Sequence, residues 1–250
     1  MKAMILAAGL GTRLRPLTND RPKALVEIQG HTLLEITLKR LRSIGVLDVI
    51  VNVHHFADKV LDYLKAHESF GLRVEISREE VLLDTGGGLK RAAHFFLERG
   101  GDTDEPFILH NVDVLSTIEL DKMVRFHRES GALATLAVQA RETSRYLLFD
   151  QHALLCGRRA GRDGSPEFVR DVDRFESLAF TGVHVISPRC LSMLGDEEAF
   201  PIVKTYLRVA GQGEKILGFR ADEYYWRDLG RPESIAQATA DVEEGKYSIS

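Results

Sequence analysis

Strand-like and helix-like stretches alternate along the first 115 residues, and no other feature restricts the fold so strongly. The apolar run Lys2–Ala8 ends at a glycine and predicts a buried strand. Apolar residues then recur at helical spacing in Leu33–Ile44, after Thr32 as a candidate N-cap. Further strands are predicted at Asp48–Val53, Leu72–Ile76 and Phe107–His110, and further helices at Ala57–Ala66, Leu89–Leu97 and Glu119–Ser130. This order predicts a parallel sheet that helices cover on both faces.

The second half has a different texture, because predicted strands outnumber helices in it. The strands are expected at Ala132–Val138, Tyr146–Phe149, Leu154–Cys156, Phe180–Ile186, Lys215–Phe219 and Tyr224–Trp226, and the helices at Phe200–Val209 and Pro232–Glu243. The polar segment Gly157–Ser165 is rich in glycine and arginine and predicts an exposed loop. We therefore expect one α/β domain over residues 1–250. Its fold is predicted to be a doubly wound, mostly parallel, Rossmann-like mixed sheet with helices on both faces and a smaller antiparallel portion.

Composition narrows the class of protein. A chain of 250 residues, 44% of them hydrophobic, can bury a core without disulfides or structural metal. The 33 Lys and Arg against 37 Asp and Glu give a formal net charge of −4, which argues against nucleic-acid binding. The apolar start is too short for a signal peptide, and no run approaches a membrane span. Cys156 and Cys190 form no metal or redox pattern, so we expect a cytoplasmic protein with reduced thiols.

The loop after the first predicted strand has the residues of a phosphate-binding site. Gly9 and Gly11 would let backbone N–H groups approach an anion closely. Arg13 offers a fork of donors to phosphoryl oxygens, and Lys23 adds a further positive charge. In open α/β sheets, ligands collect beyond the carboxyl ends of the strands, which is where this loop lies. The loop therefore predicts a phosphorylated ligand.

Two common phosphate motifs fit this loop poorly. A dinucleotide fingerprint needs a small residue three positions after Gly11, and Leu14 stands there. A Walker loop needs Gly-Lys followed by Ser or Thr, and this triplet is absent. The loop also continues to Lys23 before any predicted helix. A different kind of phosphate site is therefore expected.

The ordered residues of this loop resemble the signature of sugar-1-phosphate nucleotidyltransferases. They are Leu-Ala-Ala-Gly-x-Gly-Thr-Arg at 6–13 and Pro-Lys at 22–23. The resemblance extends over nearly the whole chain, through the landmarks Leu83–Gly88, Asn111–Asp113, Phe180–Val183 and Trp226–Pro232. The chain is most similar to N-acetylmuramate-1-phosphate uridylyltransferases and to mannose- and heptose-1-phosphate guanylyltransferases.

This resemblance implies that a sugar 1-phosphate attacks the α-phosphorus of a nucleoside triphosphate and releases pyrophosphate, with UTP slightly favoured over GTP. An in-line transfer of this kind depends on positioning and charge neutralisation. The resemblance implies catalytic roles for Arg13, Lys23 and Asp113. It also implies Mg²⁺ as cofactor, held by Asp113 and Asp228, which are 115 positions apart (228 − 113). Because each aspartate follows a predicted strand, the sheet could bring them together.

The resemblance implies binding residues in both halves of the chain. Nucleotide-binding residues are implied at Ala7, Ala8, Gly9, Gly11, Thr12, Arg13, Glu80, Thr85, Gly86 and Gly87, and sugar-phosphate-binding residues at Lys23, Thr181 and Gly182. Residues 1–115 would thus bind mainly the nucleotide, and residues 116–250, with the antiparallel portion, mainly the sugar phosphate. Gly86–Gly88 precede a predicted helix and could present free amides to the nucleoside.

Departures from the family pattern leave other functions open. Val112 stands where many members have glycine, and the usual Glu-Lys-Pro segment is missing from the region of Arg158, Arg159 and Arg162. One alternative is an inactive nucleotide-binding regulatory module, although retention of the paired cations and carboxylates argues against it. Another is a cytidylyltransferase that acts on a phosphorylated alcohol such as phosphocholine. An edge strand or helix could also form a homodimer interface, although no periodic apolar seam marks one.

Overall fold

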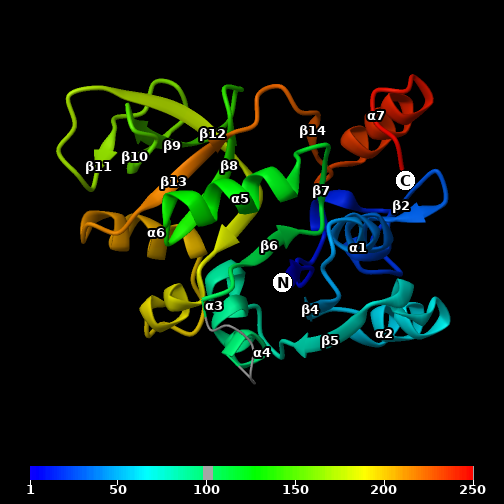
Figure 1. Ribbon diagram of the computed structural model, residues 1–250. Coiled ribbons are helices and arrows are strands. Elements are labelled where there is room, and N and C mark those ends of the chain that lie inside the picture. Colours follow the sequence, from blue (N-terminus) through cyan, green and yellow to red (C-terminus); the bar gives the residue numbers. More distant parts are fainter. Residues whose placement is uncertain (98–103, 250) are drawn as a thin grey trace.

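The structure, a computed structural model, describes residues 1–97 and 104–249. Within these residues one mixed sheet contains ten strands, and β1 lies near its middle (Figure 1). The strands are β1 (Lys2–Leu6), β4 (Asp48–Val53), β5 (Arg73–Arg78), β6 (Phe107–Asn111), β8 (Ala134–Gln139), β9 (Arg145–Asp150), β10 (Leu155–Ala160), β11 (Glu167–Phe168), β12 (Phe175–Ile186) and β13 (Ile216–Arg220). Their order is β11–β10–β9–β12–β6–β1–β4–β5, with β8 beside β12 and β13 beside β8.

Parallel and antiparallel pairing occupy different parts of the sheet. Strands β6, β1, β4 and β5 run parallel, and so do β8 and β13. Strand β12 is antiparallel to β6, β8 and β9, and β10 is antiparallel to β9 and β11. The predicted α/β class, with a parallel nucleus and an antiparallel portion, is confirmed.

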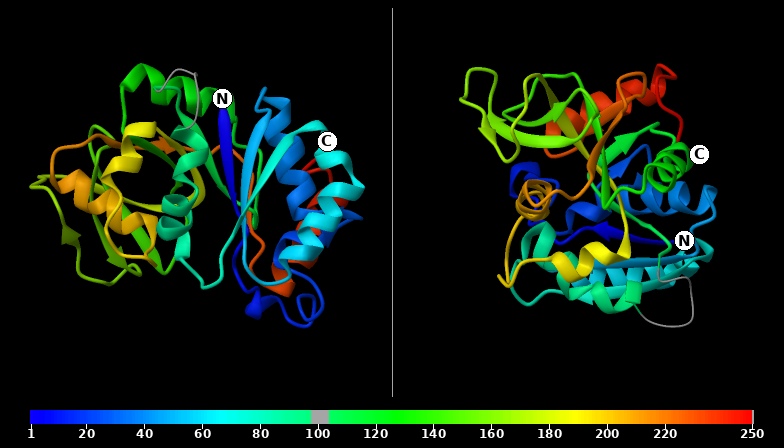
Figure 2. Two further views of the ribbon diagram at one scale, coloured as in Figure 1. Left: turned by 90° about the horizontal axis from the view of Figure 1, so that it is seen from below. Right: turned by 60° about the vertical axis from the view of Figure 1, so that its left-hand side comes forward.

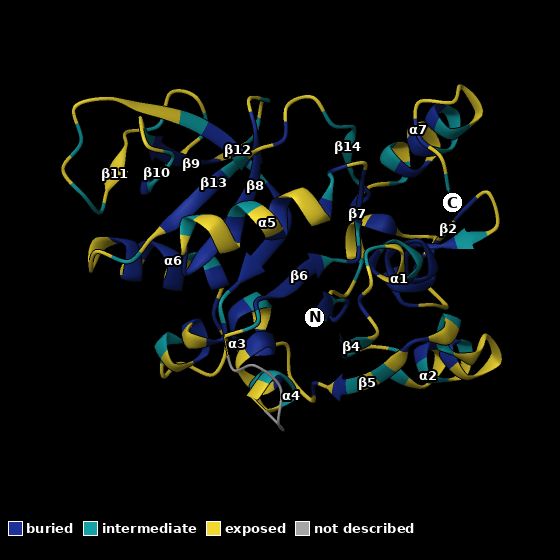
Figure 3. Ribbon diagram, viewed as in Figure 1, coloured by how far each residue is buried: buried dark blue, intermediate teal, exposed yellow. Residues whose placement is uncertain are grey.

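Helices cover both faces of this sheet. Along β1, the buried side chains of Ala3 and Ile5 join one core and that of Met4 joins the other, as the two-residue period of a strand requires. The first core packs under α1 (Leu33–Ser43), α2 (Ala57–Ala66), α5 (Leu120–Ser130) and α7 (Pro232–Glu243), and the second under α3 (Asp84–Arg91), α4 (Ala93–Leu97) and α6 (Ile202–Gly211). Figure 2 shows α1 and α2 on one side of β1 and α3 on the other. Figure 3 shows that the central strands are buried, whereas the outer faces of the helices are exposed.

Local capping agrees with the sequence at α1. Thr32 is its N-cap, and the side-chain oxygen of Thr32 accepts a hydrogen bond from the Glu35 amide at 3.0 Å. The short strands outside the main sheet form two ribbons, β2 (Glu27–Ile28) with β3 (His31–Thr32) and β7 (Val114–Ser116) with β14 (Trp226–Asp228). Strand β14 begins at Trp226, where the predicted strand Tyr224–Trp226 was expected to end, so the prediction is displaced by two residues.

The glycine triplet lies inside a helix, so the prediction that it precedes one is wrong. Helix α3 already begins at Asp84, and a separate helix, α4, follows it. A Cβ atom at Gly87 would lie 2.2 Å from the carbonyl oxygen of Glu198, and one at Gly86 would lie 2.3 Å from the Phe200 ring. The glycines therefore let α3 pack directly against the segment that leads into α6.

The loop predicted at Gly157–Ser165 is wrong over its first residues. Strand β10 continues to Ala160 and pairs with β9, and only the remainder of the segment forms a turn. Gly157 permits this pairing because a Cβ atom there would lie 2.5 Å from the carbonyl oxygen of Glu167 in β11. Polar composition misled the prediction, since β10 and β11 lie at the exposed end of the sheet.

The two cysteines are both buried and unpaired. Burial raises the pKa of the Cys156 thiol to about 11 and that of the Cys190 thiol to about 12, so both are poor nucleophiles. Among the described residues, no helix has the length and apolar character needed to cross a bilayer.

Candidate active site

The glycine loop after β1 has a conformation that depends on Gly11. Gly11 has a φ of +64°, and its carbonyl oxygen accepts hydrogen bonds from the Leu14 amide and the Thr18 hydroxyl, both at 2.8 Å. A side chain would be strained at this φ, and a Cβ atom would lie 3.0 Å from the Thr18 methyl group. The following turn, Thr12–Leu14, buries Leu14 completely in the core. This anchor fixes the turn that holds Thr12 and Arg13 at the pocket.

Lys23 enters the site from a second short turn. The turn Lys23–Leu25 is buried, and the Lys23 side chain is only 10% exposed. Its Nζ atom donates to Oδ2 of Asp113, whose side chain is 20% exposed. A cation and a carboxylate from distant parts of the chain are thus paired in a wall of low solvent access, where their charges are screened little by water.

Asp228 ends strand β14, and Asp113 directly precedes strand β7, its partner in one ribbon. In the β7–β14 pair, Asp228 lies opposite Val114, the neighbour of Asp113. The Leu229 amide donates to the Asp113 carbonyl oxygen at 2.8 Å, which holds the two chain segments together. The expectation that the fold brings these distant aspartates together is met.

Gly230 closes this group on the side of Arg13. Its amide donates to Oδ1 of Asp228 at 2.9 Å. A Cβ atom at Gly230 would lie 2.6 Å from that same oxygen and 2.9 Å from Nη2 of Arg13. The Arg13 guanidinium and the Asp228 carboxylate therefore both lie against Gly230, and only glycine leaves room for both.

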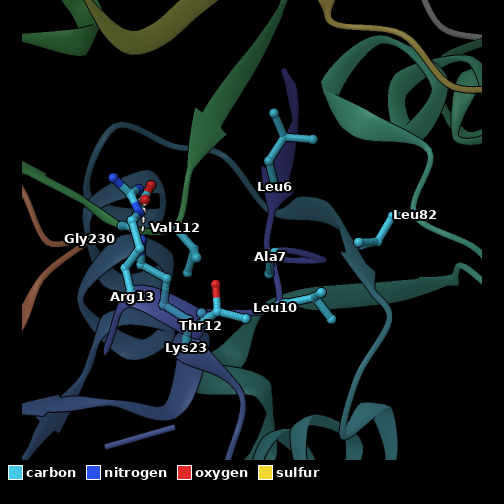
Figure 4. A pocket seen from close by; sticks show the side chains of 12 residues that line it. Leu6, Ala7, Leu10, Thr12, Arg13, Lys23, Leu82, Val112 and Gly230 are labelled. Atoms are coloured by element: carbon cyan, nitrogen blue, oxygen red, sulfur yellow. Dashed lines mark hydrogen bonds and ion pairs between the residues drawn. The ribbon is translucent and has the colours of Figure 1, made fainter. Parts of the chain in front are cut away.

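These elements surround a pocket of about 320 Å³. Its lining residues are Leu6, Ala7, Gly9, Leu10, Gly11, Thr12, Arg13, Lys23, Leu82, Val112, Asp113 and Gly230. Figure 4 shows Arg13 and Lys23 near Gly230 on one side, and Leu10 and Leu82 on the other. The pocket thus has a charged side suited to phosphates and an apolar side suited to a flat organic group.

Two carboxylates fit a magnesium ion that is shared with a phosphate ligand. Mg²⁺ commonly takes one or two protein carboxylates and completes its shell with substrate phosphates and water. Among the residues that the structure describes, no group of three or more His, Cys, Asp or Glu side chains could hold a metal ion. Asp113 and Asp228 therefore suit an ion that arrives with its nucleotide better than a permanently held one.

Part of the predicted nucleotide-binding set lies outside this pocket. Ala8, Glu80, Thr85, Gly86 and Gly87 are not among its lining residues. The Thr85 hydroxyl accepts a hydrogen bond from the Ile202 amide at 2.9 Å, and the Gly86 amide donates to the Phe200 carbonyl oxygen at 2.8 Å. These groups already have protein partners, so their contact with a nucleotide stays a prediction.

The predicted sugar-phosphate residues in β12 lie against the segment that contains Asp113, where Gly182 contacts Asn111 and Val114. Gly182 has a φ of +84°, and a Cβ atom there would lie 2.7 Å from the Asn111 side-chain nitrogen. The buried Thr181 hydroxyl donates to the Ala137 carbonyl oxygen at 2.9 Å, while the Thr181 carbonyl oxygen accepts from the Trp226 indole at 2.8 Å. Thr181 and Gly182 therefore place backbone beside the site, and the Thr181 hydroxyl serves the fold.

Sequence reasoning assigned no binding role to five lining residues, which are Leu6, Leu10, Leu82, Val112 and Gly230. Leu10 and Leu82 are exposed and carry no local signal of function, because single exposed leucines are common on protein surfaces. Gly230 lies within the landmark Trp226–Pro232, so its glycine could have been singled out. Val112 is 4% exposed and packs into the core, and its amide donates to the Leu6 carbonyl oxygen at 3.1 Å. Its side chain therefore belongs to the floor of the pocket.

Residues 2–149 match the family described as Nucleotidyl transferase. The chain belongs to this family. An N-acetylmuramate alpha-1-phosphate uridylyltransferase from Caulobacter vibrioides is 35% identical to it in an alignment of 254 positions that covers 97% of each chain. A UTP–glucose-1-phosphate uridylyltransferase from Synechocystis is 36% identical in an alignment of 253 positions that covers 97% of this chain and 63% of that protein. The family resemblance seen in the sequence is therefore confirmed.

A solved structure of the same fold supports the architecture. The HddC protein of Yersinia pseudotuberculosis, complexed with GMP-PN, superposes with a TM-score of 0.74 at 22% identity. The alignment covers 96% of this chain and 99% of that one. That protein thus shares the mixed sheet of this chain.

Proposed function

We propose that this protein transfers a nucleoside monophosphate from a nucleoside triphosphate to a sugar 1-phosphate, with release of pyrophosphate and formation of a nucleotide sugar. The observation that carries the proposal is the convergence of Arg13, Lys23 and Asp113 at the pocket behind the glycine loop, with Asp228 beside it next to Gly230. A binding module would not need two carboxylates beside two phosphate-binding cations. The similarity of this chain to the two uridylyltransferases named above supports UTP as its donor, and GTP is the next candidate.

Each charged residue has a role that its position supports. Arg13 would bind the phosphate oxygens through its planar fork, and Lys23 would neutralise charge on the α-phosphate during attack. Asp113 and Asp228 would hold Mg²⁺, which when bound neutralises charge on the triphosphate and on the leaving pyrophosphate. Lys23 donates to Asp113, so the lysine also fixes the orientation of this carboxylate. The attacking phosphate is already ionised, and no general base is required.

The two sides of the pocket support one orientation of the nucleotide. Ala7, Gly9, Gly11 and Thr12 line the pocket between its charged and apolar sides, and they would contact the triphosphate and ribose. Leu10 and Leu82 would pack against the nucleoside on the apolar side. The sugar phosphate would approach along Thr181 and Gly182, in the half formed mainly by residues 116–250. Because Asp228 and Gly230 come from that half, the two halves share the magnesium site.

A matrix of four nucleoside triphosphates against several sugar 1-phosphates, with pyrophosphate release as the measurement, tests this proposal. We expect turnover that requires Mg²⁺, with the highest rate for UTP and one acceptor. Phosphocholine with CTP is included as an acceptor outside the sugar class, and preferred turnover of that pair would overturn the sugar assignment. Tight nucleotide binding without turnover for every pair would instead favour a regulatory module. The reaction is expected in the cytoplasm, where nucleoside triphosphates are available.

A further inference from the structure

Two arginines near Tyr146 have buried nitrogen atoms without a hydrogen-bond partner. In the described part of the chain, the buried side-chain atoms in this state are Nε of Arg141, Nε of Arg159 and Nε2 of His110. Arg159 lies directly opposite Tyr146 in the β9–β10 pair, and its guanidinium carbon is 5.3 Å from the centre of the Tyr146 ring. A buried N–H group of a cation that lacks an acceptor is costly, which indicates that an external acceptor completes this region.

Arg141 lies between Asp228, proposed to hold Mg²⁺, and strand β12, along which the sugar phosphate is proposed to approach. Its guanidinium carbon lies 3.6 Å from the centre of the Trp226 ring, and Trp226 is two residues before Asp228. One terminal nitrogen of Arg141 donates to the Phe180 carbonyl oxygen at 2.9 Å, directly before Thr181. Burial lowers the pKa of Arg141, and the nearby Asp228 carboxylate partly opposes this effect. The other terminal nitrogen donates to the Glu142 carbonyl oxygen at 3.4 Å, so indole stacking and two hydrogen bonds fix the plane of the guanidinium.

Arg159 differs from the two arginines that are its neighbours in sequence. Arg158 pairs with Glu167 at 2.7 Å, and Arg162 pairs with Glu142 at 3.7 Å. For the Arg159 side chain, the described part of the chain provides the Tyr146 ring but no hydrogen bond or ion pair. The structure therefore distinguishes Arg159 within a basic segment where spacing alone could not.

We propose that Arg141 and Arg159, both next to Tyr146, bind the phosphate group of the acceptor substrate. A phosphate monoester carries oxygens that can accept from both guanidinium groups, and arginine suits such planar, charge-assisted recognition. The two cations would supply positive charge where this chain lacks the Glu-Lys-Pro segment. The identity of the acceptor as a sugar 1-phosphate rests on the proposed function, whereas the binding of a phosphate group by these arginines does not.

Steady-state kinetics with three methionine variants test this site. Arg141→Met and Arg159→Met are each expected to raise KM for the sugar 1-phosphate at least about tenfold and to change KM for the triphosphate less than about twofold, since each removes one charge-assisted contact. Arg158→Met is the matched control, because Arg158 is the exposed neighbour on the same strand and is paired with Glu167. Arg141→Lys, which keeps the charge and loses the planar fork, should fall between wild type and Arg141→Met. Thermal melting identifies any variant that fails to fold.

Binding can be measured without turnover, because Trp226 is the single tryptophan of the chain and stacks on Arg141. Titration of the wild type with glucose 1-phosphate and with inorganic phosphate, with and without Mg²⁺ and α,β-methylene-UTP, should give a saturable change in tryptophan emission. Arg159→Met keeps the Arg141–Trp226 pair, so loss of the response in this variant would report loss of binding. Arg158→Met should respond as the wild type does.

The outcomes separate this site from the proposed function. If the wild type turns over sugar 1-phosphates and both methionine variants behave like Arg158→Met, the arginine site is refuted while the proposed function stands. If no substrate pair turns over but the emission change saturates and depends on Arg159, the phosphate site stands and the proposed function fails. If the wild type shows neither turnover nor a saturable emission change, both are refuted.

Discussion

The two sides of the candidate site differ in how their charges are balanced. On the triphosphate side, Lys23 is paired with Asp113, and the Arg13 guanidinium and the Asp228 carboxylate both lie next to Gly230. On the side of Tyr146, the Nε atoms of two arginines are buried without an acceptor. The first side is therefore assembled from the protein's own charges, whereas the second has a surplus of positive charge that a ligand would balance. This contrast indicates that the nucleotide side is preorganised and that the acceptor side is completed on binding.

The two sides also differ in how the chain builds them. The glycine loop of the triphosphate side is one continuous segment after a parallel strand, and Gly11 gives this loop its left-handed conformation, whereas Asp113 and Asp228 join it from distant segments. The other side combines residues of β9, β10 and β14 with the segment after β8. A contiguous loop leaves a readable motif in the sequence, but side chains that meet across several strands do not.

The largest expected effect comes from replacing Asp113 on the preorganised side. Asp113→Ala should lower kcat by at least about 10²-fold, because it removes a carboxylate proposed to hold Mg²⁺ and leaves the Lys23 charge without its partner. Pyrophosphate release at saturating substrate measures this effect. Asp62→Ala removes an exposed carboxylate on α2 and should leave kcat unchanged. Near wild-type activity in Asp113→Ala would show that this side is not the catalytic one.

A second variant tests whether the glycine triplet belongs to the fold or to the nucleotide side. Gly87→Ala would place a methyl group 2.2 Å from the Glu198 carbonyl oxygen, so it should lower the free energy of unfolding. The expected loss is about 1–3 kcal/mol, or about 2–4 °C in Tm for each kcal/mol. Gly195→Ala is the control, since a Cβ atom there has no neighbour within 4 Å. A Gly87→Ala protein with unchanged Tm but weaker UTP binding would show that Gly86–Gly88 contribute to nucleotide binding rather than to the packing of the fold.

A pH titration tests two buried histidines of the central sheet, His110 in β6 and His184 in β12. Burial lowers the pKa of His184 and that of His110 to about 3, and the neighbouring His110 contributes to the shift at His184. The unfolded state thus binds more protons than the folded state below the ordinary histidine pKa of about 6.5. The free energy of unfolding should therefore fall as the pH decreases from about 6.5 to about 3, by up to about 1.4 kcal/mol per pH unit for each histidine.

Chemical denaturation of a His184→Gln variant at several pH values checks this linkage. The variant cannot gain a proton at position 184, so the stability of the folded state should depend less steeply on pH over this range. His152→Gln, which replaces an exposed histidine, should keep the wild-type slope. Equal slopes in all three proteins would mean that His184 does not remain neutral in the folded state.

The smallest effect is expected on the apolar side of the pocket. Leu10→Ala and Leu82→Ala shorten exposed side chains that line the pocket, so each should raise KM for the triphosphate about two- to fivefold and leave kcat almost unchanged. Leu47→Ala shortens an exposed leucine that does not line the pocket and provides the control. Equal increases in KM for the sugar 1-phosphate would show that the nucleoside does not occupy this side.

The sequence predicted the elements better than their boundaries. Periodicity located β1, α1, β4 and α2 almost to the residue, because each is a local pattern of buried side chains. The prediction failed at α3, because its glycines indicated a loop. It also failed at β10, because the polar residues of this strand indicated a loop. In both cases a neighbouring segment decides the structure: Glu198 and Phe200 pack on α3, and β11 pairs with β10. Propensity is a weak guide wherever such tertiary contacts compensate for it.

By itself, the sequence determined the family, the parallel nucleus of the fold and the identity of the charged residues, because these depend on short motifs and on local periodicity. Only the tertiary structure placed Asp228 beside Asp113 and Arg159 beside Tyr146, and gave Arg141 its position on Trp226. The physical reason is that these neighbours depend on strand register between distant segments. Register is set by the packing of whole faces of the sheet, which no local run of residues encodes.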